Sequence, residues 1–144
     1  MNEALILSAV ANGAYKYSPQ FVPVNRIAYP SAAASGVAIN VWVTSADFAS
    51  YAQVAPDRLG SHVELDPGAM IVREVLSGGN VAKLTLMVEG PAGYNPDLGD
   101  FWFGVIAPDG TPLVDKGEER TGKLQQCYSC RIPRKDDGYL FGVP

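Results

Sequence analysis

Two adjacent glycines, Gly78 and Gly79, separate two apolar runs of strand-like composition, residues 70–76 and 81–89. A tight turn between antiparallel strands needs residues that accept a positive φ, and glycine does so without steric cost. The sequence therefore predicts a β-hairpin here. Alternate residues of the second run should face opposite sides of the sheet. One side carries Ala82, Leu84, Leu86 and Val88, and the other carries Val81, Lys83, Thr85, Met87 and Glu89.

Two other segments have the composition of strands. Residues 37–43 carry β-branched side chains at alternate positions, and residues 100–106 place Phe101, Phe103 and Val105 opposite Trp102 and Ile106. The Pro-Asp-Gly sequence at 108–110 is a turn signal. We expect residues 111–114 to pair back across it.

Helices are predicted around these strands. Leu7, Val10, Ala11 and Ala14 fall at helical spacing, and Asn12-Gly13 marks the end of that helix. Thr44 or Ser45 can cap a short helix in which Phe48, Tyr51 and Ala52 share a face, and a helical turn should carry Cys127 and Cys130. Residues 18–35, with three prolines, predict an irregular, well-packed loop leading into the sheet.

The fold class that follows is α+β, a single domain with an antiparallel β-sheet and flanking helices. Residues 1–36 form its N-terminal helix and lead-in loop, and residues 37–144 form the main body. The Gly78-Gly79 pair lacks the spacing and the following helix of a phosphate-binding loop.

Charge and hydropathy exclude two classes of partner. With 11 basic against 15 acidic residues the net charge is −4, the wrong sign for a general nucleic-acid binder. No apolar run approaches the roughly 18 residues of a membrane span. The first 11 residues lack the basic region of a signal peptide. We expect either a cytosolic protein or a mature form without its leader.

The chemistry-bearing motif is Cys127-Tyr128-Ser129-Cys130-Arg131. Two thiols at this spacing can form a disulfide, contribute to a metal site or carry two thioether bonds to haem. A structural zinc site needs about four ligands, and His62 is the only histidine. His62 is expected at the surface, with a substitute iron ligand as the alternative. Arg131 stands where a c-type haem site has its axial histidine, and a guanidinium offers iron no lone pair.

Residues 37–144 resemble the cytochrome P460 family, which includes the beta-type cytochromes c′. The segments that carry the resemblance are Pro67–Val75, Leu84–Glu89, Gly93–Pro96, Gly99–Phe103, Pro108–Gly110, Cys127–Cys130 and Asp137–Gly142. The resemblance implies an antiparallel sheet with flanking helices, export to the periplasm and frequent homodimers. It also implies a c-type haem near the C-terminus, used to oxidise hydroxylamine or to bind nitric oxide.

Two positions depart from the family pattern. Arg131 replaces the axial histidine. The lysine that cross-links to the porphyrin in P460 enzymes is expected near the end of residues 81–89, where this chain has Glu89; Lys83 lies six residues earlier. Because of these two departures, we expect a retained scaffold that has lost haem ligation and acts as a binding or interaction module without a cofactor.

Alternatives remain open at this point. One is a haem c protein with changed axial ligation, in which Cys127 and Cys130 hold the haem. Another is a thiol–disulfide protein that uses the same two cysteines. The sequence leaves open whether the protein is an enzyme, and it predicts no metal site.

Several aromatic residues could line a small-molecule pocket, which would be the former haem pocket. The candidates are Tyr94, Phe101, Trp102, Phe103 and Tyr128. They are equally suited to the core. Glu74 interrupts an apolar strand, so we expect it either at an edge or buried beside Arg73 or another cation. For Arg131 the expected partner is a carboxylate such as Asp136 or Asp137.

Overall fold

The computed structural model describes residues 1–31, 36–54 and 63–124. Its helices and strands are, in order, α1 (Glu3–Val10), β1 (Phe21–Pro23), β2 (Tyr29–Pro30), β3 (Val37–Thr44), α2 (Phe48–Tyr51), β4 (Met70–Ser77), β5 (Asn80–Glu89), β6 (Phe101–Ile106), β7 (Val114–Asp115), β8 (Glu118–Glu119) and β9 (Thr121–Gly122). Short 3₁₀ segments follow α1 at Ala11–Tyr17, precede α2 at Ser45–Asp47 and precede β6 at Pro96–Leu98.

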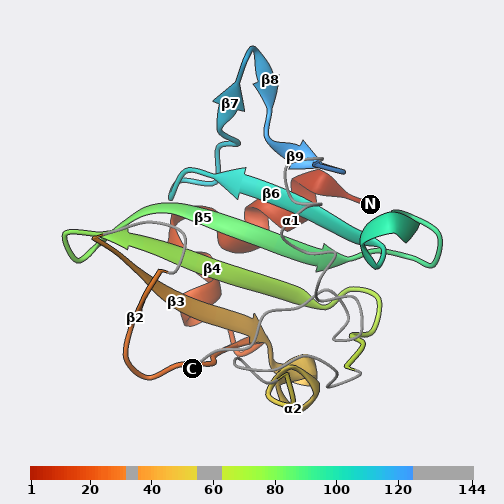
Figure 1. Cartoon of the computed structure of the whole chain (residues 1–144), viewed down its shortest axis with the longest axis horizontal. Coiled ribbons are helices and arrows are strands. Elements are labelled where there is room, and N and C mark those ends of the chain that lie inside the picture. The colour runs from red at the N-terminus through yellow and green to blue at the C-terminus, as the bar shows by residue number, and fades with distance from the viewer. Residues whose placement is uncertain (32–35, 55–62, 125–144) are drawn as a thin grey trace.

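Seven strands form one antiparallel sheet (Figure 1). The order is β1-β3-β4-β5-β6-β9, and β2 also pairs with β3. Strands β7 and β8 form a separate hairpin that projects beyond the sheet (Figure 1). The predicted α+β domain with an antiparallel sheet and flanking helices is confirmed.

The central hairpin joins β4 to β5 through Gly78 and Gly79, which have φ values of 60° and 83°. Val75 pairs with Lys83 and Leu76 with Val81, so Ala82 is an extra residue in β5. Such a bulge reverses the alternation of side chains beyond it. The predicted faces are therefore wrong at Val81 and Ala82, because Val81 packs on the face of Leu84 while Ala82 is exposed.

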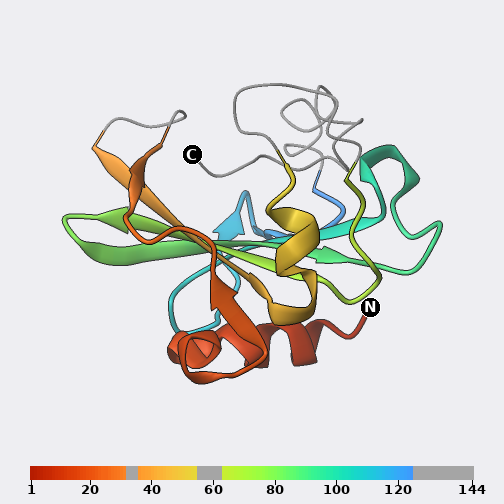
Figure 2. The ribbon, with the colours of Figure 1, turned by 90° about the horizontal axis from the view of Figure 1, so that it is seen from below.

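The sheet has an apolar core on each face. The α2 core contains Ile39, Val41, Val43, Tyr51, Val54, Val63, Leu65, Ala69, Ile71, Met87, Leu98, Phe101 and Phe103. The α1 core contains Ile6, Val10, Tyr15, Phe21, Met70, Val72, Leu84, Leu86, Val88, Trp102 and Ile106. Figure 2 shows α1 and the segment after it against one face of the sheet. The predicted opposition of Phe101 and Phe103 to Trp102 and Ile106 is confirmed.

Helix α1 begins at Asn2, whose side chain accepts a hydrogen bond from the Leu5 N–H at 3.2 Å. It ends at Val10, and the expected stop signal follows directly, at Asn12 and Gly13, which have φ values of 54° and 74°. We call residues Ala11–Tyr17 the kinked segment. Val10 is buried and Leu7 packs against the core, as the predicted face requires, but after the kink Tyr15 is buried while Ala14 is exposed.

The turn after β6 supports the end of α1. The Asn12 N–H donates to the Pro108 carbonyl at 2.9 Å. Gly110 has φ +95°, and a Cβ at that position would lie 2.7 Å from the Cβ of Ala11. Only glycine allows this close approach.

Strand β6 is buried along its whole length. A Cβ at Gly104 would lie 2.7 Å from Cη2 of Trp102, so the missing side chain leaves room for the indole ring. Of the predicted residues 111–114, residues 111–113 pair back toward β6, since the Leu113 N–H donates to the Val105 carbonyl at 2.9 Å, whereas Val114 pairs with Glu119 of β8.

The lead-in loop is more regular than expected, because β1 and β2 both pair with β3. Asn25 joins these elements: its amide donates to the Ile27 carbonyl at 2.9 Å and to Asn40 Oδ1 at 3.0 Å. Its oxygen accepts from the Val41 N–H at 2.7 Å. The segment is held by partners distant in the chain, which local composition does not reveal.

The predicted short helix is present, and the three residues expected to share a face differ in burial. In α2 only Tyr51 is buried, whereas Phe48 is 39% exposed and Ala52 is exposed. The Thr44 hydroxyl does not cap the helix and donates instead to Asp47 Oδ2.

Candidate functional site

The predicted haem motif lies outside the described residues. This holds for Cys127, Tyr128, Cys130 and Arg131, and also for His62. The predictions about these residues remain predictions from the sequence.

The other predicted pocket aromatics fall on both faces of the sheet. Phe101 and Phe103 belong to the α2 core, with ring centroids 6.2 Å apart. Trp102 belongs to the α1 core, and Tyr94 packs against that core with Lys123 Nζ 4.9 Å from its ring centroid. Since the sheet separates the two pairs, these four residues do not surround one common cavity.

Glu89 ends β5 and pairs with Phe101 of β6. Its side chain is partly buried, and burial raises its pKa to about 8, with further contributions from the negative charges of Asp100 and Glu64. The carboxyl group is therefore mostly protonated at neutral pH. In that form it can donate a hydrogen bond.

An apolar groove of about 510 Å³ also borders Glu89. Its other lining residues are Met1, Asn2, Leu5, Ile6, Pro67, Gly68, Met70, Val88 and Pro91. The groove lies between α1 and the end of the sheet where β4 begins and β5 ends. Leu5, at its rim, is 66% exposed.

Glu74 is a buried acidic side chain with three side-chain partners. It is 2% exposed in the middle of β4, and its carboxylate accepts hydrogen bonds from the Tyr15 hydroxyl at 2.5 Å and from Trp42 Nε1 at 3.2 Å. Lys16 Nζ lies 3.0 Å from Glu74 Oε2. Of the two expected placements, burial beside a cation is confirmed, and the cation is Lys16.

The protonation of this cluster follows from its contacts. Burial alone would raise the pKa of Glu74, but the hydrogen bonds from Tyr15, Lys16 and Trp42, together with the Lys16 charge, outweigh it and lower the pKa. Burial and the neighbouring carboxylate raise the pKa of Tyr15 above its ordinary value. Glu74 is thus ionised and Tyr15 protonated at neutral pH, which keeps the phenol as the donor.

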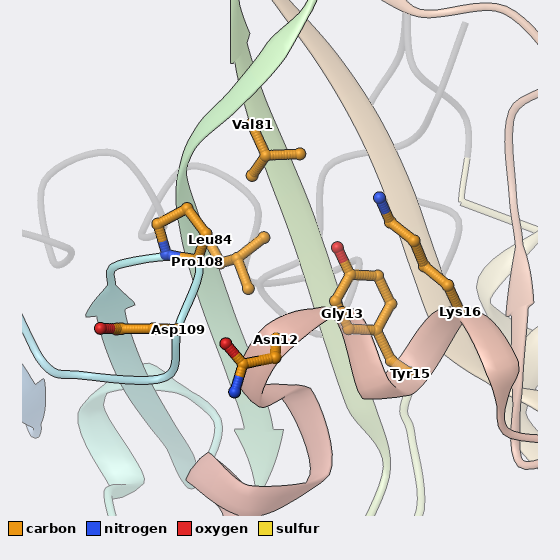
Figure 3. A pocket seen from close by; sticks show the side chains of 8 residues that line it. All are labelled: Asn12, Gly13, Tyr15, Lys16, Val81, Leu84, Pro108 and Asp109. Atoms are coloured by element: carbon orange, nitrogen blue, oxygen red, sulfur yellow. The ribbon is translucent and has the colours of Figure 1, made fainter.

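A pocket of about 430 Å³ opens beside this cluster (Figure 3). Leu84 and Val81 form its apolar floor, Tyr15 and Lys16 stand on one side, and Pro108 stands on the other. The remaining lining residues are Asn12, Gly13 and Asp109. Its volume lies within the range of about 300–1,000 Å³ that is usual for small-molecule sites.

Sequence reasoning identified Glu74 but missed Tyr15, Lys16 and the pocket beside them. A buried carboxylate must have a compensating donor or cation, so Glu74 itself was the available signal. Which lysine supplies the charge depends on how the kinked segment docks on the sheet. That docking is not visible in local sequence.

Within residues 1–31, 36–54 and 63–124, no group of three or more metal-binding side chains is present. In the same residues, none of the helices has the length and hydropathy needed to cross a membrane. Comparisons with protein-family models, with curated proteins and with solved structures found no match.

Proposed function

We propose that this protein is a cytochrome P460-like binding module that works without haem. The observation that supports this most directly is Glu89, which ends β5 where the resemblance expects the cross-linking lysine. A carboxyl group has no amine with which to form that cross-link. Arg131 adds to the argument, because the sequence lacks an imidazole directly after Cys130.

Glu89 also supports a binding role. With a pKa raised to about 8, its partly buried carboxyl group presents a hydrogen-bond donor at neutral pH. A neutral acid of this kind suits a small ligand with a carbonyl or other acceptor. In this proposal the ligand occupies the space that haem fills in the family.

A second candidate is a haem c protein with changed axial ligation. The spacing of Cys127 and Cys130 favours it, since two cysteines so placed are what two thioether bonds require. The residues present do not fit the P460 cofactor itself, because neither the axial histidine nor the lysine is at its expected position.

The deciding experiment is an absorption spectrum and a haem stain of the protein exported together with a c-type haem maturation system. We expect a colourless, unstained protein. A stained band with a Soret absorption that survives acid-acetone extraction would refute the haem-free proposal and support the second candidate.

The matched variant is Arg131→His, which restores the imidazole while keeping both cysteines. If haem attaches to this variant but not to the unmodified chain, the loss of haem is assigned to position 131. If the folded variant also stays unstained, the loss extends beyond that residue. The double variant Arg131→His/Cys127→Ala controls for noncovalent haem.

The resemblance further supports export to an oxidising compartment, the pairing of Cys127 with Cys130 and a homodimer. Alkylation without reductant, followed by intact-mass measurement, tests the cysteines. We expect no added label, and two labelled thiols would contradict the disulfide. Sedimentation equilibrium tests the dimer.

A further inference from the structure

We propose that the pocket beside the kinked segment binds a small organic monocarboxylate with an apolar body, held by Lys16 and Asn12. This site lies on the α1 face of the sheet. It does not depend on whether the protein carries haem.

The pocket has an apolar floor with polar side chains at its edges. Val81 and Leu84 of β5 provide the floor, and Pro108 provides an apolar side (Figure 3). The side chains of Asn12 and Lys16 stand at different ends of the opening (Figure 3). A ligand whose carboxylate meets Lys16 and whose apolar body covers Val81 and Leu84 matches this arrangement.

Lys16 lines the pocket, and its ammonium group has N–H donors that are not used by Glu74. An ammonium group has three N–H donors. Glu74 Oε2 lies 3.0 Å from Nζ and takes one of them, and the Lys16 side chain keeps 38% of its surface exposed. The ion pair fixes the position of the ammonium, so a ligand carboxylate meets an already oriented donor.

The acidic groups near the pocket do not present a site for a cationic ligand. Glu74 already accepts from Tyr15, Trp42 and Lys16. The Asp109 carboxylate accepts from the Thr111 N–H at 2.8 Å and is directed away from the opening (Figure 3). Lys16 is therefore the charged side chain directed toward the pocket, which favours an anionic ligand group there.

Asn12 and Tyr15 add the remaining polar groups. In the described residues the Asn12 side chain has no protein partner, so its amide N–H₂ is available to a ligand oxygen. The Tyr15 hydroxyl donates to Glu74, which leaves its oxygen as an acceptor for a protonated ligand group or a water molecule.

The test is a titration of the ¹⁵N-labelled full chain with benzoate, and separately with its isosteres benzamide and benzylamine. We expect benzoate to shift the amide signals of Gly13 and Lys16 saturably. Benzamide and benzylamine should bind at least about tenfold more weakly, because they lose the charge-assisted hydrogen bond. Absence of a saturable shift, or equal binding of benzamide, overturns the proposal.

Four variants locate the site. Lys16→Met should weaken benzoate binding at least about tenfold, and Lys16→Arg should restore most of it. Asn12→Gly, which tolerates the φ of 54°, should weaken binding about three- to tenfold. Val81→Phe should fill the pocket and abolish binding.

Lys83→Met is the control. Lys83 lies on β5, as Val81 and Leu84 do, but it faces the opposite side of the sheet. The affinity of this variant for benzoate should equal that of the unmodified chain. If Lys16→Met fails to fold, Asn12→Gly and Val81→Phe decide the outcome. Unchanged affinity in either of these two variants overturns the proposal.

Discussion

The Tyr15 hydroxyl donates a hydrogen bond to the Glu74 carboxylate across 59 positions of the chain. It joins the kinked segment after α1 to the middle of β4. Tyr15 also packs edge-on against Trp42, with ring centroids 5.5 Å apart, and Trp42 bonds the same carboxylate. The Glu74 carboxylate thus connects the kinked segment to the sheet by hydrogen bonds inside the apolar α1 core.

Removing this hydrogen bond should destabilise the protein. Tyr15→Phe is expected to lower the free energy of unfolding by about 1–2 kcal/mol, since Glu74 keeps two other donors. Urea denaturation measures the change. Tyr17→Phe in the same segment is the control, because Tyr17 is 89% exposed, and it should have no effect. Equal effects of the two variants would contradict a role for the buried hydroxyl.

Glu74 should make the protein sensitive to acid. Because the folded state lowers its pKa, the stability it contributes is present above the ordinary pKa of 4.5 and is lost as the pH falls through the folded value. Glu74→Gln should cost about 2–4 kcal/mol at pH 7 and less at pH 3. Urea unfolding at both pH values tests this. A constant difference would show that ionisation of Glu74 is not involved.

Glu89 should change the stability of the protein with pH in the direction opposite to Glu74. Its pKa is raised to about 8, so its contribution to stability is present below the ordinary pKa of 4.5 and is lost as the pH rises through 8. Glu89→Gln should therefore stabilise the protein at pH 8.5 by about 1–2 kcal/mol, a value reduced for partial exposure, and change little at pH 4. Thermal melts at both pH values measure this, with exposed Glu119→Gln as control. Parallel shifts at both pH values would refute it.

Gly110→Ala should destabilise the contact between α1 and the turn after β6. The new Cβ would meet Ala11 at 2.7 Å and force a positive φ on alanine, at a cost of about 2–4 kcal/mol. Gly117→Ala has a similar φ of +80° in open space and should cost only about 1 kcal/mol. The difference in urea midpoint between the two variants isolates the contact. Equal losses would mean that only φ matters.

Asn25→Ala should loosen the lead-in loop from β3. Loss of its bonds to Ile27, Asn40 and Val41 is expected to cost about 1–3 kcal/mol and to raise proteolysis between β1 and β2. Limited trypsin digestion at Arg26, followed by mass spectrometry, reads this out. The exposed Gln20→Ala is the control, and an unchanged rate of cleavage at Arg26 in the Asn25 variant would contradict the prediction.

Local signals predicted the hairpin and strand β6 well. A Gly-Gly turn and the alternation of side chains between the two faces of a strand both depend on neighbouring residues, so they can be recognised in the sequence. The same reasoning failed at Val81, because the extra residue Ala82 in β5 reverses the alternation, and at β1 and β2, whose pairing depends on β3.

The candidate site was only partly predictable. A buried Glu74 implied a cation, but the choice of Lys16 rather than the neighbouring Arg73 follows from alternation along β4, which turns Arg73 to the other face of the sheet. The pocket combines Lys16 and Asn12 from the N-terminal segment with Val81 from β5 and Pro108 from the turn after β6. Such a combination exists only after tertiary docking.

The order of the strands has a consequence for how the protein opens. Strands β3, β4 and β5 each pair with the next strand in sequence. Helix α1 and the kinked segment dock mainly on strands distant in the chain, although Tyr15 also packs against Phe21 of the nearby β1. Undocking the N-terminal segment would leave the meander paired, so amide hydrogens on that segment should exchange with solvent through a local opening before those of β4 and β5. That opening also dismantles the pocket, because Asn12 and Lys16 leave with the segment. A ligand bound there would stabilise the docked state and slow this exchange by mass action.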